Sequence, residues 1–305
     1  SGQATLLIRL TLIFKMPKQL FLTGFLHSSM DALILSPIPY SALFAIAAIG
    51  LPHGSLDGAI ASFLGFKNMK SFSKFLIFYV CISIGVIFFW FYFPVISLLL
   101  FLLISIYHFG SCDANSVNNK IHRLIISIAH GGSVVIGVIF FQTLISFKIF
   151  EYLSGPDVYA YVNFVDYFFY VILFFIGFYL YLCLKNKNLF LKFIEIPFIL
   201  LIAYIAHPLV TFSIYFCCIH TPRHTIDVIR NLKRNNFHYK KIIYTTMIFT
   251  VLSWILGLIG YLYLLPILGN SESVLKVIFI GLAALTLPHM ILVDGFYKPK
   301  TRKLN

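Results

Sequence analysis

Long apolar runs divide this chain and limit what it can fold into. A helix needs about 20 residues to cross the hydrocarbon core of a bilayer. Runs that approach or exceed this length lie near residues 33–50, 75–93, 94–110, 121–147, 164–184, 194–219, 242–266 and 274–293. No alternation of period two is sustained, so a β-barrel is not expected. We predict an all-α fold, a polytopic transmembrane bundle of about eight spans with additional short or re-entrant half-helices.

The balance of charged and apolar residues supports this prediction. Only 11% of the residues are charged and 60% are hydrophobic, whereas about 25% of a soluble chain is charged. The net charge of +13 could suggest a nucleic-acid partner, but the basic residues are spread through short loops between the apolar runs. The positive-inside rule explains that distribution better. The lipid bilayer is therefore the expected surrounding, and no nucleic acid is expected.

The charged loops predict a topology. Basic residues mark the loops around 67–74, 120–123, 185–192 and 223–241 as cytoplasmic, whereas acidic residues predominate at 148–163 and 267–273. The run at 194–219 is interrupted at His207-Pro208, and proline ends or kinks a helix, so two half-spans should meet there. We expect three parts: an N-terminal segment at 1–32, one transmembrane domain at 33–295, and a basic cytoplasmic tail at 296–305.

Histidine occurs near the ends of apolar runs in four separated segments, each with an aspartate shortly after it. The segments are GLPHGSLDG (50–58), SIYHFGSCD (105–113), CCIHTPRHTID (217–227) and TLPHMILVD (286–294). The topology places these histidines together, near the cytoplasmic leaflet. Ionisable groups at membrane depth are costly and usually functional, so we expect the segments to converge on one site.

Imidazole clusters of this kind favour a metal centre. Neutral imidazole is the commonest protein ligand of first-row metals, and a site built from it suits iron, copper or zinc. His220 and His224 are four residues apart, which puts them on one helical face. The expected ligands are His53, His108, His220 and His224, with His289 as a second-tier candidate. Aspartates often orient metal-bound imidazoles, and the candidates are Asp57, Asp113, Asp227 and Asp294.

Aromatic residues and cysteines beside the histidines have simpler explanations. Four aromatic residues could line a pocket for a long apolar substrate, although ordinary helix packing explains them equally well: Tyr107, Phe109, Tyr215 and Phe216. The chain has five cysteines and no CxxC pair. We expect these cysteines to be small packing residues rather than disulfides or metal thiolates.

The four histidine segments, in this order and at these separations, resemble the Brp/Blh family of membrane β-carotene 15,15'-dioxygenases of bacteria and archaea. The resemblance rests on GLPHGSLDG, YHFGSCD, HTPRH and LPHM and covers most of residues 33–295. It implies cleavage of the central double bond of β-carotene by O2 to give two molecules of all-trans-retinal. It also implies a non-haem Fe(2+) held by His53, His108, His220 and His224, a multi-pass protein of the cytoplasmic membrane, and a link to a microbial rhodopsin that uses the retinal.

Two other functions stay open at this point. A membrane di-iron hydroxylase or desaturase would need more ligands than four histidines, and His289 with the four aspartates could supply them; counting the irons would decide. A retinoid or metal transporter would need a polar path through both leaflets, whereas the polar residues of this chain cluster toward one.

Overall fold

The computed structural model describes residues 36–114, 117–235 and 237–298, and these residues form helices and short connections with no strand among them. The first half contains α3 (Pro37–Ala45), η2 (Ile46–Gly50), η3 (Leu51–Leu56), α4 (Asp57–Leu64), α5 (Met69–Tyr92), α6 (Pro94–Asp113), α7 (Lys120–Gly132), η4 (Ser133–Gly137), α8 (Val138–Phe141) and α9 (Thr143–Ser154). The second half contains η5 (Pro156–Tyr161), α10 (Val162–Lys185), η6 (Lys187–Leu189), α11 (Phe190–Phe193), α12 (Glu195–Ile205), α13 (Pro208–Ser213), η7 (Ile214–His220), α14 (Thr221–Arg234), α15 (Tyr239–Met290) and η8 (Ile291–Tyr297).

The predicted all-α membrane bundle is confirmed. Among the described residues, seven helical stretches are long and apolar enough to cross a bilayer: Pro37–Leu64, Met69–Tyr92, Pro94–Cys112, Lys120–Phe141, Pro156–Lys185, Lys187–Ile205 and Ile242–Tyr297. The last stretch has 56 residues and contains two of the predicted runs. The predicted segment 1–32 and most of the tail 296–305 lie outside the described residues.

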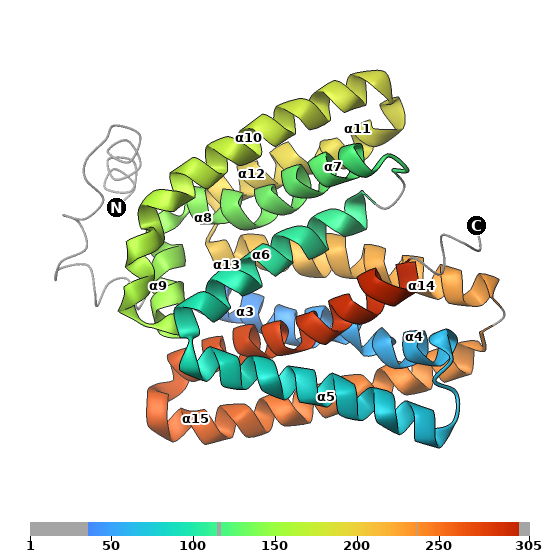
Figure 1. Cartoon of the computed structure of the whole chain (residues 1–305). Helices are drawn as coiled ribbons and strands as arrows, with labels where there is room; N and C mark the ends of the chain where they lie inside the picture. Colours follow the sequence, from blue (N-terminus) through green and yellow to red (C-terminus); the bar gives the residue numbers. More distant parts are fainter. Residues whose placement is uncertain (1–35, 115–116, 236, 299–305) are drawn as a thin grey trace.

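The longest helical stretch turns back on itself at Gly269. This residue has a φ of 76° inside α15, a backbone conformation that glycine adopts without the steric cost of a Cβ. The two arms of α15 meet at this turn and lie beside α5 (Figure 1). The turn therefore explains how one helical stretch holds two spans.

The break predicted at His207-Pro208 is present. Ala206 and His207 have extended backbones, Pro208 lies in the first turn of α13, and the His207 ring accepts a hydrogen bond from the N–H of Leu209. Figure 1 shows that α12 and the segment from α13 to α14 run in opposite directions. His207 is thus a helix cap, and the break returns the chain to the end of the bundle from which it came.

The predicted run at 121–147 is divided at Gln142, which the apolar pattern does not reveal. The backbone of Gln142 leaves the helical region, with φ −124° and ψ 43°. Its side-chain amide donates hydrogen bonds to the carbonyls of Ala203 and Tyr204. This contact ties the bend between α8 and α9 to the end of α12.

Helices α6 and α7 cross with their backbones in contact. A Cβ built on Gly110 would lie 1.9 Å from the carbonyl oxygen of Ser127, and one on Gly131 would lie 1.9 Å from that of Ile106. Small residues permit such close helix crossings in membranes. Because Gly110 is two residues from His108, this crossing fixes the end of α6 that carries the histidine.

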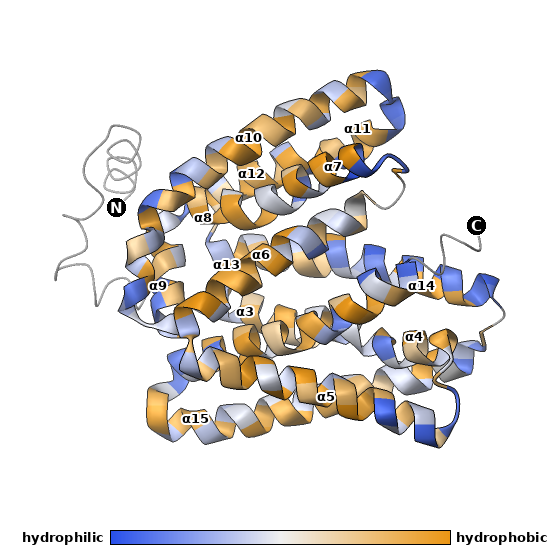
Figure 2. Cartoon of the chain, in the orientation of Figure 1, coloured by the Kyte–Doolittle hydropathy of each residue, from blue (hydrophilic) through white to orange (hydrophobic). Residues whose placement is uncertain are grey.

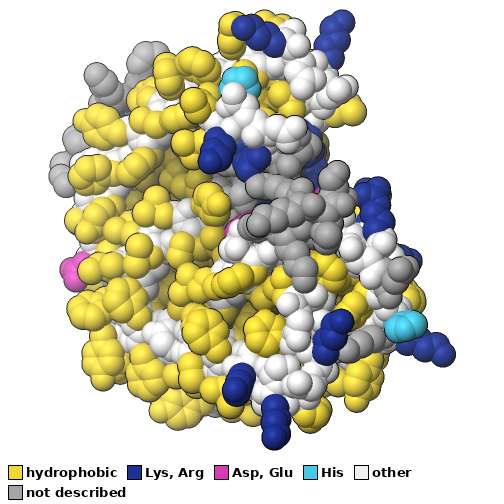
Figure 3. Space-filling view, turned by 45° about the vertical axis from the view of Figure 1, so that its right-hand side comes forward, with side chains coloured by type: hydrophobic (Ala, Val, Ile, Leu, Met, Phe, Trp, Pro, Cys, Tyr) yellow, Lys and Arg dark blue, Asp and Glu magenta, His cyan; other side chains and the backbone are white. Residues whose placement is uncertain are grey.

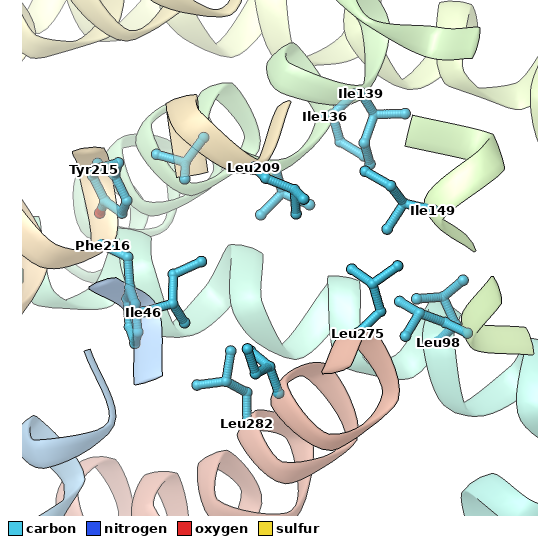
Figure 4. Close-up of a cluster of buried hydrophobic side chains, with 14 of the residues drawn as sticks. Ile46, Leu98, Ile136, Ile139, Ile149, Leu209, Tyr215, Phe216, Leu275 and Leu282 are labelled. Atoms are coloured by element: carbon cyan, nitrogen blue, oxygen red, sulfur yellow. The ribbon is translucent and has the colours of Figure 1, made fainter. Parts of the chain in front are cut away.

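Hydrophobic residues predominate along the helices, and hydrophilic ones gather toward the helix ends and the connections between them (Figure 2). One buried cluster joins side chains from many helices, including Ile46, Leu98, Ile136, Ile139, Ile149, Leu209, Tyr215, Phe216, Leu275 and Leu282 (Figure 4). Figure 3 shows lysine and arginine side chains toward one side of the surface, beside a broad hydrophobic area. The apolar core reaches Tyr215 and Phe216, which adjoin the predicted histidine site.

Candidate metal centre

Four buried histidine rings form a closed group at the end of the bundle that carries α14. The side chains of His108, His220, His224 and His289 are between 2% and 5% exposed. Successive ring centroids are 5.0 Å apart for His108 and His220, 6.2 Å for His220 and His224, 5.2 Å for His224 and His289, and 5.2 Å for His289 and His108. Histidines from three of the four predicted segments therefore converge, and His289 belongs to the group as fully as the other three.

The pair His220 and His224 lies where a π-helical segment passes into α14. The π-helix η7 ends at His220, and Pro222 occupies the first turn of α14, where its missing N–H costs no bond within that helix. The two imidazole planes are 3° from parallel, as expected for side chains on one helical face. Another π-helix, η8, begins two residues after His289. Such wider turns are frequent at functional sites.

Asp57 holds the ring of His289. The Oδ1 atom of Asp57 is 2.8 Å from Nδ1 of His289, and its Oδ2 accepts a hydrogen bond of 2.9 Å from the hydroxyl of Tyr79. Asp57 is fully buried. With Nδ1 engaged by the carboxylate, Nε2 is the candidate ligand atom of His289, which is the arrangement that metal-bound imidazoles commonly show.

Asp294 lies beside His108. Its Oδ2 atom is 3.7 Å from Nδ1 of His108, and its Oδ1 atom forms an ion pair with Lys298. Lys298 also donates a hydrogen bond to Ser111. Among the described residues, neither ring nitrogen of His108 has a hydrogen-bond partner. A buried imidazole in this state is suited to ligand binding, because an unsatisfied polar group is otherwise costly.

Two of the aspartates lie beside histidines from segments other than their own. Asp57 follows His53 in the sequence but contacts His289, and Asp294 follows His289 but lies beside His108. The sequence predicted that carboxylates would accompany the imidazoles, but it did not indicate which aspartate contacts which histidine, because that pairing depends on how the helices pack.

Cys112 is the residue whose surroundings differ most from expectation. Ligand atoms of His108, Cys112 and His220 lie within 4.8 Å of one another, although we expected every cysteine to be a packing residue. The spacing of four residues from His108 was a usable signal. The other four cysteines, two buried and two exposed, are also free thiols: Cys81, Cys183, Cys217 and Cys218.

Aromatic rings cover one side of the histidine group. The ring centroids of Phe109, Phe216 and Tyr215 lie 4.9, 5.8 and 6.2 Å from that of His220. Tyr107 differs from its predicted place, because it is 50% exposed on the outside of the bundle. A helix turns about 100° per residue, so residues adjacent to His108 cannot all face the same way as the histidine.

Three predicted residues need separate mention. The side chains of His53 and Asp113 lie outside the described part of the structure; the backbone of His53 belongs to η3, which packs against α15 and α14. Asp227 is exposed and lies 3.9 Å from Arg230. It lines a small pocket together with His224, Cys112 and Lys298, so it lies at the outer side of the histidine group.

Comparisons with known proteins identify the family of this chain. Residues 44–297 match the family model described as Beta-carotene 15,15'-dioxygenase. A protein of that name from the uncultured marine bacterium 66A03 is 35% identical over 269 residues, which cover 88% of this chain and 97% of the relative. No solved structure matches. The chain therefore belongs to the β-carotene 15,15'-dioxygenase family.

Proposed function

We propose that this protein cleaves the central 15,15' double bond of β-carotene with O2 and releases two molecules of all-trans-retinal. The family model and the relative from bacterium 66A03 carry the name of this activity. The structural observation that carries the proposal is the closed group of four buried imidazoles inside a membrane bundle. A hydrocarbon substrate dissolved in the bilayer requires a reaction centre at membrane depth.

The histidine group fits a single ferrous ion. With metal–nitrogen distances of about 2.1 Å, imidazoles that share one metal have ring centroids roughly 4.5–6.5 Å apart. The four measured separations, from 5.0 to 6.2 Å, fall in this range. We propose that His108, His220, His224 and His289 hold Fe(2+) together with His53. Neutral imidazoles suit iron, and when bound it would supply the activation of O2.

The reaction needs no reductant. The C15=C15' and O=O bonds break, and two C=O bonds form, so both oxygen atoms enter the two aldehydes. In this reaction Asp57 and Tyr79 would keep the His289 ring in place, while Asp294 would do so for His108. Phe109, Tyr215 and Phe216 would exclude water and offer apolar contacts to the polyene.

The location of the site suits this substrate. We propose that the histidine end of the bundle lies near the cytoplasmic leaflet, because basic residues are concentrated in the loops that the positive-inside rule assigns to the cytoplasm. We propose that the protein resides in the cytoplasmic membrane and that β-carotene enters between helices from the lipid. Retinal released there would be available to a microbial rhodopsin in the same membrane.

Product analysis tests the proposal. The protein is purified without O2, loaded with Fe(2+), and supplied with β-carotene and O2 in the absence of a reductant. We expect two molecules of retinal for each β-carotene consumed and none from metal-free protein. Apocarotenals of unequal length in comparable amounts would contradict central cleavage. A hydroxylated or desaturated carotenoid, formed only with a reductant and two irons per chain, would favour the di-iron alternative.

A further inference from the structure

A second group of ionisable side chains, one buried and two partly exposed, lies on residues to which the proposed reaction assigns no part. Glu195, the first residue of α12, forms an ion pair through its Oε1 with the guanidinium of Arg223 on α14. Its other oxygen, Oε2, lies 3.7 Å from Nε2 of His130 on α7. His130 is fully buried. One carboxylate therefore connects three helices.

Arg223 sits in the turn that carries two candidate ligands. It follows His220 by three residues and precedes His224 by one. This turn follows directly on the π-helix η7: the N–H of Thr221 bonds to the carbonyl of Phe216, but Pro222 offers no N–H. The turn therefore lacks one backbone hydrogen bond, and a side-chain contact to a neighbouring helix helps to fix it.

The contact of Glu195 with His130 connects this group to α7, the helix that crosses α6, which carries His108. His130 precedes Gly131, whose backbone touches α6 at Ile106, and Gly110 touches α7 in the same crossing. In addition, the ring of His130 is 6.1 Å from that of Tyr215, which packs beside His220. Glu195 is therefore placed between the α6–α7 pair, which carries His108, and the turn of His220 and His224.

The energetics of the Glu195–Arg223 ion pair favour a role in positioning the histidines over a role in stabilising the whole fold. A desolvated ion pair often adds little net stability, because taking the charges out of water offsets their attraction. The Glu195 and Arg223 side chains are only 22% and 25% exposed. We infer that Glu195 is a positioning residue: through Arg223 it sets where His220 and His224 lie relative to His108. This inference rests on the proposed iron site.

Metal titration of the full-length protein tests this inference. Fe(2+) affinity and the absorption spectrum of bound Co(2+) are measured for Glu195→Gln and Arg223→Lys. Glu272→Gln is the matched control, since Glu272 pairs with Lys276 at 2.8 Å with similar exposures of 27% and 25%. We expect a loss of roughly 10 to 100-fold in affinity and an altered Co(2+) spectrum in the two variants, with unchanged helical content. The control should resemble the unmodified protein.

A double variant separates this role from general destabilisation. If Glu195 acts through Arg223, Glu195→Gln combined with Arg223→Lys should lose no more affinity than the worse single variant. Arg223→Lys keeps the charge, so it carries the test if Glu195→Gln does not fold. Unmodified affinity and spectrum in the single variants, or additive losses, would overturn the inference and leave the proposed function intact. Failure of the unmodified protein to bind metal would overturn both.

Discussion

The two ends of the bundle differ in how far apart in the sequence their paired ionisable side chains lie. At the end with the Gly269 turn and α9 (Figure 1), Lys148 pairs with Glu151 and Lys276 with Glu272, partners three and four residues apart. At the histidine end, Lys298 pairs with Asp294 four residues away, but Asp57 pairs with His289, 232 residues away in the sequence. The first kind of pair needs only a helix, whereas the second needs the whole fold.

The difference indicates which end of the bundle carries the functional site. A partly exposed pair within one helix, such as that of Lys276 and Glu272, typically contributes less than about 1 kcal/mol and is easily formed. A fully buried carboxylate costs free energy to desolvate and usually marks a functional site when it lies at membrane depth. We therefore expect substitutions at the histidine end to affect metal binding and activity, and those at the other end to affect stability alone.

The largest expected effect is loss of a ligand. His108→Ala, His220→Ala, His224→Ala and His289→Ala should each abolish bound iron and retinal formation while the protein still inserts in the membrane, because each removes one imidazole of a closed group. Iron analysis and product chromatography measure both effects. The exposed His122 and His238 provide controls, and their alanine variants should keep both properties. Full activity in two of the four variants would disprove the assignment. His53→Ala should behave like the four.

A steric change at the α6–α7 crossing comes next. Gly110→Ala would put a methyl group on the backbone of Ser127, and a backbone atom cannot move aside as a side chain can. Overpacking typically costs about 1–3 kcal/mol, and here it should also displace His108 and weaken iron binding. Gly85 on α5 has no heavy atom within 4 Å of a built Cβ, so Gly85→Ala is the control. Equal thermal unfolding midpoints in the two variants would contradict the close crossing.

Changing the carboxylate of Asp57 should have a smaller effect than removing a ligand. Asp57→Asn keeps the shape but weakens the contact to His289, so iron affinity should fall roughly 10 to 100-fold. Tyr79→Phe removes one hydrogen bond to Asp57 and should cost less. Titration with Fe(2+) measures both. Complete loss of iron in Asp57→Asn would instead make Asp57 a ligand and would favour the di-iron alternative.

The aromatic cover should control which double bond reacts. Phe109→Ala enlarges the space beside His220, so the polyene can shift and products other than retinal should appear, because a small misplacement changes which bond meets the reaction centre. Tyr107→Ala, on the exposed side of the same helix, should still give retinal alone. Chromatography of the aldehydes distinguishes the two, and identical product profiles would show that Phe109 does not set the register.

The smallest effect is expected at the other end of the bundle. Glu272→Gln should reduce the free energy of unfolding by no more than about 1 kcal/mol, since its partner Lys276 is one helical turn away. Iron affinity should not change. A loss of metal binding in this variant would mean that the two ends are coupled, which would break the contrast drawn between them.

The helical architecture could be predicted from the sequence because it depends on local properties. Apolar runs of sufficient length dictate membrane helices, and Pro208 marks a break through its missing N–H. The bend at Gln142 could not be predicted, because it depends on carbonyls of α12, some 60 residues away.

The candidate site was predictable to a similar degree. Repeated histidines at the ends of apolar runs indicated the group, and the spacing of His220 and His224 indicated their shared face. The carboxylate partners were not assignable, because the contact of Asp57 with His289 arises only when η3 and α4 pack against α15. Tyr79 had no sequence signal at all, since it lies in an ordinary apolar helix.

X-ray absorption at the iron edge of the unmodified, anaerobically loaded protein tests the central claim most directly. The account predicts one iron per chain, surrounded by nitrogen at about 2.1 Å with the outer-shell scattering of several imidazoles, and a reduced imidazole signal in His289→Ala. A second iron at roughly 3.5–4 Å, or an iron without imidazole scattering, would contradict the claim that the four buried rings surround a single metal ion.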